Sequence, residues 1–509
     1  MRKTRPETVT LFLGTAAVVV WQSSRLTVLW DLSFILENAT RIAMGDVPYR
    51  DFPFPYAPLT FLVQSLIIRL FGRVAWHHVA YAALAAGLAS VLAYEIVRTI
   101  EPRRVTAFLL TLPLILLGIY CIFPHPFYDP DCCLVVLVVV LLLRRDAQLA
   151  AGVMAVVAVF VKQNIGLSLV IALIALAVLT KRWRIVAGVV AASVVSIAIV
   201  AMAFGIDNYV RWTVRFAAER RLMPIREYLS IYADPTLWWW LGGVAIGVLL
   251  MRWSHVAAAI VISLPCFWIF TANDLVDREV HLLRVWPLVL IVAAAIGVVA
   301  LIRERDIVPL LIVGAIHGTF LSQLTWGSTY GIWPLLVILL AYCFRRLPRF
   351  APVALVAALL FAGFTYVVEN QRLTYVKLDG PTHRSQLPAL RGMTVAGEWL
   401  PDFESLVAWL DRNVPRDDAI LFLPGEDPLY FTTGRRPRLP VLMFDRTINP
   451  YDAATIARLA DERGVRWVIV KTRLQLNGVP METLGETLRL VTNGAREAAR
   501  IGPYTIFRR

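Results

Sequence analysis

The sequence predicts a polytopic α-helical membrane protein with a small α/β domain at its C-terminus. Hydrophobic residues make up 58% of the 509 positions and charged residues only 17%, too few polar side chains to cover a soluble protein of this length. Apolar runs long enough to enter a bilayer recur from residue 8 to residue 368. After residue 370 these runs become short and alternate with amphipathic stretches. We therefore predict a membrane domain over residues 1–370 and a water-soluble domain over 371–509.

About thirteen transmembrane helices are expected from the apolar runs. The first run follows the basic residues 2–5 directly and shows no small-residue cleavage site, which indicates an uncleaved span rather than a signal peptide. The runs cover residues 8–30, 74–97, 105–123, 131–143, 147–161, 164–180, 185–204, 236–251, 255–271, 283–302, 307–321, 331–344 and 351–368.

The segment 57–72 decides the orientation, because it is short and contains Gln64 and Arg69. If it lies along the membrane surface, the basic clusters that follow the later spans share one side with the basic N-terminus. That arrangement satisfies the positive-inside rule. We therefore predict a multi-pass protein of the inner (cytoplasmic) membrane with an interfacial helix at 57–72, a cytoplasmic N-terminus and an extracytoplasmic C-terminal domain.

The net charge of +14 has an ordinary explanation in such a protein, since cytoplasmic loops carry an excess of Lys and Arg. No nucleic-acid partner is predicted. The five cysteines lie in or beside apolar runs and form neither a disulfide framework nor a C-x-x-C metal motif, so they are read as buried thiols.

The first outer loop covers residues 31–56 and begins at Asp31, directly after the first span. A carboxylate is favoured at a helix N-terminus, and a helix over 32–44 would place Glu37 and Arg41 four residues apart on one face. Its apolar face would turn toward the membrane. The proline-rich remainder of the loop cannot be helical and is expected to form a rigid lid. Its projecting side chains would be Tyr49, Arg50, Asp51 and Tyr56.

Other outer stretches also carry unusual polar residues. Asp129 and Asp131 directly precede an apolar run, where carboxylates are costly, which favours function over a plain turn. Lys162 lies between two spans on the outer side, where the charge bias disfavours a basic residue; snorkelling is the plainer alternative to a phosphate contact. Arg211 and Arg215 are spaced to grip a phosphate, although a surface helix over lipid headgroups would show the same pattern.

A further polar cluster precedes the span at 283–302. Arg278, His281 and Arg284 are its candidates for contact with phosphate or acceptor, although a lone His is more often a satisfied interface residue. Three carboxylates in the same stretch could bind a divalent cation, but their spacing is not that of a ligand set. No metal site and no certain cofactor are therefore predicted.

In the C-terminal domain, strands are expected at 419–424, 441–445, 467–471 and 505–507, with helices at 401–414 and 450–464. The sequence contains no glycine-rich phosphate loop there. Its most charged loop is 424–437. Covering a membrane cavity, binding the acceptor and a purely structural role all remain open for this domain.

The first outer loop carries a family resemblance. The pattern W-D followed by G-x-V-P-Y-R-D-F and P-L, just after a first span, resembles the polyprenyl-phosphate-sugar-dependent glycosyltransferases of the GT-C superfamily, whose relatives include protein O-mannosyltransferases and the lipid A aminoarabinose transferase. Asp31 stands fourteen residues before Gly45, where the resemblance expects the catalytic aspartate. Many relatives have a second acidic residue next, and this chain has Leu32 instead. HPFYDPD at 125–131 and FVKQN at 160–164 extend the resemblance, with a weaker echo at His281.

The resemblance implies an inverting glycosyltransferase with a GT-C-like fold. It would transfer a sugar from a polyprenyl-phosphate donor to a glycan, lipid or protein acceptor at the outer face of the membrane, with Asp31 as general base and Glu37 in support. Removing the proton of an acceptor hydroxyl needs one positioned carboxylate. The departing lipid phosphate needs positive charge around its oxygens. The predicted substrate-binding residues are Tyr49, Arg50, Asp51, Asp129, Asp131, Lys162, Arg211, Arg215, Arg278, His281 and Arg284.

Two other classes of function compete. A lipid or sugar transporter or flippase usually shows internal repeats and charges at mid-span, whereas the polar residues here gather on one face. A non-catalytic envelope-assembly protein would fit if Leu32 marks lost activity. For Asp31, the plainer interpretation is a helix cap, which is compatible with catalysis.

Overall fold

The computed structural model describes most of the chain. The described residues are 5–23, 29–121, 124–221, 224–268, 271, 275–321, 331–345, 350–368, 371–372, 375–376, 380–445, 448–474 and 481–509. They fall into two compact units, each assembled from separate stretches of sequence. The first unit comprises Met1–Gln22, Ala82–Ile197 and Leu222–Leu373, and the second comprises Ser23–Tyr81, Ala198–Arg221 and Thr374–Arg509. The predicted boundary at residue 370 stays a prediction.

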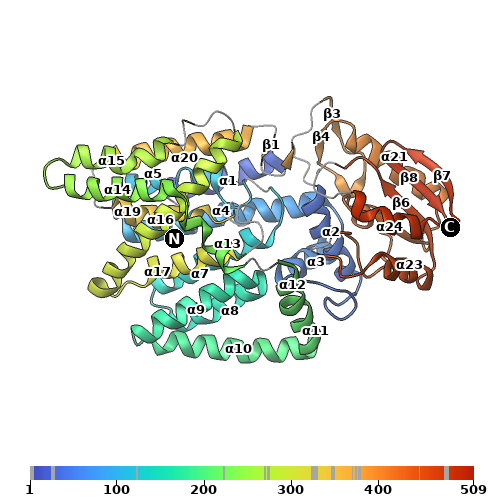
Figure 1. Cartoon of the computed structure of the whole chain (residues 1–509), viewed down its shortest axis with the longest axis horizontal. Helices are drawn as coiled ribbons and strands as arrows, with labels where there is room; N and C mark the ends of the chain where they lie inside the picture. The colour runs from blue at the N-terminus through green and yellow to red at the C-terminus, as the bar shows by residue number, and fades with distance from the viewer. Residues whose placement is uncertain are drawn as a thin grey trace. The chain divides into compact units, whose positions relative to one another are not determined.

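The first unit is built of apolar helices (Figure 1). Helix α9 packs against α8 and α17, α7 packs against α8, and α14 packs against α15. Its helices are α1 (Pro6–Ser23), most of α4 (Ala75–Ile100), α5 (Arg104–Thr111), α6 (Leu114–Leu117), α7 (Tyr128–Arg144), α8 (Gln148–Val161), α9 (Gln163–Leu179), most of α10 (Trp183–Ala203), α13 (Ile225–Leu229), α14 (Pro235–Leu250), α15 (His255–Trp268), α16 (Leu275–Glu304), α17 (Val308–Phe320), α19 (Trp333–Phe344) and α20 (Phe350–Val368).

Among the described residues, three helical segments are long and apolar enough to cross a bilayer: Ala75–Ile100, Trp183–Ala203 and Arg284–Glu304. Shorter apolar helices of 10–17 residues accompany them. The chain is therefore an integral membrane protein, as its composition predicts. The count of thirteen spans stays a prediction. The run predicted as one span at 105–123 is divided into α5 and α6 at Pro113, which has no backbone N–H to donate to the preceding turn.

The second unit contains the helix predicted for the first outer loop, α2 (Leu29–Ala43), and the helix α3 (Leu59–Phe71) in the segment expected at the membrane surface. That α3 lies on a membrane stays a prediction. The stretch after α10 forms α11 (Ile206–Val210), the π-helix η1 (Arg211–Phe216) and α12 (Ala217–Arg221).

The C-terminal part of this unit is a three-layer α/β arrangement (Figure 1). Its sheet has the order β5-β6-β8-β7; β5 and β6 are parallel and the other pairs antiparallel. One face, with Ile420 and Phe422, packs on α21, and the other, with Leu421, packs on α23 and α24. The bounds are β5 (Ala419–Leu423), β6 (Val465–Lys471), β7 (Arg496–Ile501), β8 (Tyr504–Arg508), α21 (Trp399–Asn413), α22 (Leu429–Thr433), α23 (Ala453–Glu462) and α24 (Met481–Val491). The short strands β1 (Gln371–Arg372), β2 (Tyr375–Val376), β3 (Thr382–Arg384) and β4 (Thr394–Ala396) precede the sheet.

One expected strand of this part is wrong, and one strand was not expected. The apolar run 441–445 is no strand; it closes a long loop in which Phe444 N–H donates to Pro424 O at 2.9 Å. The fourth strand is instead β7, whose sequence REAARI carries charges on its exposed positions, as an edge strand does.

The apolar face of α2 was expected to meet the membrane, and the structure corrects this. Leu36 and Ala39 are fully buried in one hydrophobic core with Trp399, Phe403 and Phe431. Protein side chains of the C-terminal part therefore cover this face. Amphipathicity alone does not distinguish a lipid partner from a protein partner, since both bury the same apolar stripe.

Candidate functional site

Helix α2 carries two carboxylates in different environments. Residues 33–42 of this helix are all buried, whereas Asp31, in the first turn, remains partly exposed. Glu37 is only 4% exposed. A carboxylate that takes a proton from a substrate must be reachable, so Asp31 suits this task better than Glu37.

Glu37 is held by protein groups from a distant part of the sequence. Its Oε1 accepts the backbone N–H of Phe431 at 3.0 Å, and Oε2 has no hydrogen-bond partner among the described residues. Burial raises the pKa of Glu37 to about 8, against the opposing effect of backbone N–H groups at Phe431 and Tyr430 and of the nearby charges of Arg73 and Arg41. Glu37 and Arg41 do lie four residues apart on one face of α2, as predicted, but their hydrogen-bond partners are other residues. Arg41 forms an ion pair with Asp46 at 3.1 Å.

The proline-rich stretch after α2 is packed rather than projecting. Tyr49 is 2% exposed, its hydroxyl donates to Tyr56 O at 2.6 Å, and its ring lies edge-on to Phe204 and Tyr209. Burial raises the pKa of Tyr49, so it acts here as a neutral donor. The expectation that Tyr49 and Tyr56 hang free from a lid is therefore wrong, because an aromatic cluster encloses both.

Arg50 and Asp51 do lie at the surface. Arg50 Nε is 3.0 Å from Asp51 Oδ1, and Asp51 Oδ2 also accepts the backbone N–H of Val47 at 2.7 Å. The side-chain hydrogen bond from Arg50 lowers the pKa of Asp51. The two residues neutralise each other in this arrangement, and their predicted contact with substrate remains a prediction.

Arg211 and Arg215 lie on the π-helix η1 and are both exposed. The Arg211 guanidinium is 5.0 Å from the ring centroid of Trp212. Single π-helical turns are rare and frequently occur at functional sites. The sequence predicted the four-residue spacing of these arginines but not the wider helix that carries them.

In the first unit, the start of α7 gathers a buried polar cluster. Lys162 Nζ lies 3.2 Å from Asp129 Oδ2 and 4.1 Å from the ring centroid of Tyr128. Asp129 Oδ1 is buried and accepts no hydrogen bond from any described residue. Asp131 is bound by the hydroxyl of Tyr120. The structure thus brings three predicted residues, Asp129, Asp131 and Lys162, to one helix end.

Sequence reasoning missed two members of this neighbourhood. Tyr120 has a positive φ of 65°, a conformation unusual for a non-glycine residue, and no sequence signal marks it. His125 is buried beside Phe127, and burial lowers its pKa to about 3, so the imidazole is neutral.

The remaining candidates lie on α16. Arg278 and His281 belong to this helix, but their side chains lie outside the described part of the structure. Arg284 forms an ion pair with Asp234 at 2.9 Å, and the same aspartate caps α14 by accepting Thr236 N–H. Within the described residues, no three His, Cys, Asp or Glu side chains are arranged to hold a metal ion.

The predicted residues thus divide between the two units. Asp31, Glu37, Tyr49, Arg50, Asp51, Arg211 and Arg215 belong to the second unit, and Asp129, Asp131, Lys162, Arg278, His281 and Arg284 belong to the first.

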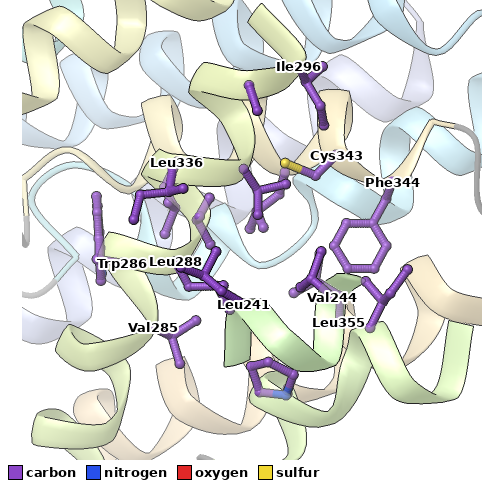
Figure 2. A pocket seen from close by; sticks show the side chains of 18 of the residues that line it. Leu241, Val244, Val285, Trp286, Leu288, Ile296, Leu336, Cys343, Phe344 and Leu355 are labelled. Atoms are coloured by element: carbon purple, nitrogen blue, oxygen red, sulfur yellow. The ribbon is translucent and has the colours of Figure 1, made fainter. Parts of the chain in front are cut away.

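The first unit also contains a partly open apolar cavity of about 460 Å³ (Figure 2). Side chains of α14, α15, α16, α19 and α20 line it, among them Leu241, Val285, Trp286 and Cys343. Figure 2 shows these side chains around the cavity. Its lining is almost entirely apolar, which suits contact with hydrocarbon rather than with a polar ligand.

No protein-family profile matches the chain, and no curated protein matches its sequence. Among solved structures, the chain is similar to ArnT from Cupriavidus metallidurans bound to undecaprenyl phosphate, with 14% identity, a TM-score of 0.48 and coverage of 98% of this chain and 97% of that one. The apo state of ArnT is similar with 13% identity, a TM-score of 0.45 and the same coverage. ArnT is a GT-C lipid A aminoarabinose transferase, one of the relatives that the sequence resembles. At these TM-scores, neither structure assigns a role to any residue of this chain.

Proposed function

We propose that the chain is a GT-C-type glycosyltransferase that moves a sugar from a polyprenyl-phosphate donor to an acceptor at the outer face of the cytoplasmic membrane. The observation that carries this proposal is the accessibility of Asp31. It remains partly exposed at the first turn of a helix whose residues 33–42 are all buried. A fixed, accessible carboxylate on a rigid element is what a general base requires.

The proposed reaction is a single displacement with inversion. The acceptor hydroxyl oxygen bonds to the anomeric carbon, its proton passes to the Asp31 carboxylate, and the bond between the anomeric carbon and the phosphate oxygen breaks. The electron pair of that bond leaves with the polyprenyl phosphate. A phosphate with its second pKa near 6 is a competent leaving group without a general acid.

The departing phosphate needs cationic partners. Exposed Arg211 and Arg215 on η1 are the candidates in the second unit. Lys162, paired with the half-satisfied Asp129, is the candidate in the first. The apolar cavity between α14 and α16 supports binding of part of an isoprenoid chain.

Transfer assays with purified protein in lipid would test the proposal. Radiolabelled polyprenyl-phosphate sugars are the donors, and release of the sugar is measured. We expect turnover by the wild type and its loss in Asp31→Asn, with the amount of folded protein unchanged. Glu462→Gln, on the exposed face of α23, is the control and should turn over normally.

Two results would count against the proposal. Wild-type turnover in Asp31→Asn would remove Asp31 as the base. No turnover by the wild type with any donor would favour a transporter or an assembly protein instead.

A further inference from the structure

A long loop of the C-terminal part contacts α2 along its length. The loop runs from residue 425 to 443, includes α22, and is closed at its base by the bond between Phe444 N–H and Pro424 O. We call these residues the 425–443 loop. Its charged sequence marks it as a surface loop, yet many of its residues are buried.

Three polar side chains of α2 meet this loop. Ser33, Glu37 and Arg41 are spaced four residues apart, so they share one face of the helix. Ser33 Oγ donates to Gly425 O at 3.3 Å, and Glu37 Oε1 accepts Phe431 N–H at 3.0 Å. At the far end, Arg41 donates to Leu439 O at 3.4 Å and to Pro440 O at 2.9 Å. All three side chains are buried.

Two further contacts bind the 425–443 loop to residues that follow α2. Arg73 Nη1 donates to Phe431 O at 2.7 Å, so both backbone groups of Phe431 are bound by side chains from the N-terminal part of the unit. Arg436 pairs with Asp46 at 3.0 Å.

The loop is anchored on its other side to the sheet. Lys471, at the end of β6, lies 2.5 Å from Glu426 Oε2 and 2.7 Å from Asp427 Oδ1, and all three are at most 1% exposed. Tyr504 and Trp399 donate to the same aspartate at 2.8 and 2.9 Å. Breaking a buried ion pair of this kind is strongly destabilising. The start of the loop is therefore fixed to the sheet.

A second anchor fixes the later part of the loop. The buried guanidinium of Arg435 donates to Leu410 O, Val414 O and Pro415 O at 3.0, 2.8 and 2.6 Å. Leu410 O, in the last turn of α21, also accepts the N–H of Val414, and the other two carbonyls follow directly after the helix, so Arg435 caps the end of α21. Tyr430 adds a bond from its hydroxyl to Ile420 O of β5 at 2.7 Å.

Backbone shape makes the fit at the start of the loop specific. Gly425 has a φ of +88°, and a Cβ there would collide with the carbonyl oxygen of Leu442. Only glycine can place its own carbonyl toward Ser33 in this way. Ser33 lies two residues from Asp31, so this contact bears on the turn that carries the proposed base.

We infer that the 425–443 loop holds α2 in place and that Glu37, through this loop, is a positioning residue for Asp31. The inference rests on the proposed function for its catalytic meaning. The C-terminal part is then a structural part of the site that presents the base. Glu37 needs only its acceptor oxygen for this task, and no proton transfer.

Kinetics separate positioning from chemistry. Glu37→Ala loses the bond to Phe431 and should lower kcat by about 100-fold while KM for the donor changes little, because misplacing a reacting group by about 1 Å has such an effect. Glu37→Gln keeps an acceptor oxygen and should restore kcat to within about threefold of the wild type. Ser33→Ala is a milder second variant, should Glu37→Ala fold poorly, and should lower kcat by about threefold to tenfold.

Hydrogen exchange measures, without any substrate, how firmly the 425–443 loop holds α2. Peptides from the first turns of α2 and from the 425–443 loop should both exchange faster in Glu37→Ala than in the wild type. Glu462→Ala, on exposed α23, is the control and should leave both peptides unchanged.

The outcomes distinguish a positioning role of Glu37 from a failure of the proposed function. If Glu37→Gln is as inactive as Asp31→Asn, Glu37 takes part in the chemistry and the positioning role is wrong. Unchanged kcat per folded molecule in Glu37→Ala also overturns it. If the wild type transfers no sugar, the proposed function fails, and hydrogen exchange alone tests whether the 425–443 loop holds α2 in place. Faster exchange of the α2 peptides in Glu37→Ala supports this role of the loop, and unchanged exchange refutes it.

Discussion

Replacing Glu37 with glutamine should remove the contribution of this buried carboxyl to the pH dependence of the stability of the second unit. Burial raises the pKa of this carboxyl from 4.5 to about 8 in the folded protein, although the charges of Arg73 and Arg41 and the backbone of Tyr430 act to lower it. Between these two values the folded state keeps a proton that the unfolded state releases. The contribution of Glu37 to stability is therefore most favourable below about pH 4.5 and falls as the pH rises to about 8.

The magnitude follows from the two pKa values. They differ by about 3.5, and each pKa unit corresponds to about 1.36 kcal/mol, so Glu37 should reduce the free energy of unfolding by about 5 kcal/mol between pH 4.5 and 8. Glutamine has a similar shape to the protonated acid and keeps the acceptor for Phe431, but it does not ionise. The variant should therefore be more stable than the wild type at pH 8 and similar to it at pH 4.5.

Thermal unfolding in detergent, followed by intrinsic fluorescence from pH 4.5 to 8.5, provides the assay. Hydrogen exchange of the peptide that contains Phe431 gives a local measurement of the same equilibrium. Glu462→Gln, an exposed carboxyl on α23, is the matched control and should follow the wild type. If the wild type and Glu37→Gln lose stability in parallel as the pH rises, the burial of an ionisable Glu37 is not the cause.

Two further predictions concern the anchors of the loop and the orientation of the chain. Lys471→Met should lower the free energy of unfolding by about 3–5 kcal/mol, since it leaves Glu426 and Asp427 buried without their cation. Arg473→Gln, at an exposed ion pair, is the control and should lower it by at most about 1 kcal/mol. Chemical denaturation measures both, and equal losses in the two variants would contradict the role of burial. A cysteine at the exposed position Arg391 should react with a membrane-impermeant thiol reagent from outside the cell, and labelling only from the cytoplasm would overturn the predicted topology.

Much of the secondary structure follows from local sequence. The helix expected at 32–44 is α2 at Leu29–Ala43, and the amphipathic stretches at 401–414 and 450–464 are α21 and α23. Three of the four expected C-terminal strands are present as β5, β6 and β8. Local sequence also explains a break in one predicted run, where α5 ends at Thr111 and α6 begins after Pro113.

The contacts of the candidate site could not be predicted in this way, because they join side chains that are distant in sequence. The sequence predicted Asp129, Asp131 and Lys162 as separate substrate-binding candidates, but not that Lys162 pairs with Asp129 or that Tyr120 binds Asp131. The sequence predicts no more than a charged loop at 424–437, which includes Glu426 and Asp427 directly after the buried strand β5. Its position at the carboxyl ends of the parallel strands β5 and β6 was the available signal.

The sequence by itself determined the class of molecule, because its apolar runs can satisfy their backbone hydrogen bonds in a membrane only as helices. It also determined the place of the candidate base, an aspartate in the first helical turn after one of these runs. Tertiary structure alone decided the partner of that helix. The group that binds Glu37 lies 394 residues away, and the apolar face of α2 meets protein instead of lipid. Periodicity reports that a face will be buried, whereas the identity of what buries it depends on contacts that no local pattern contains.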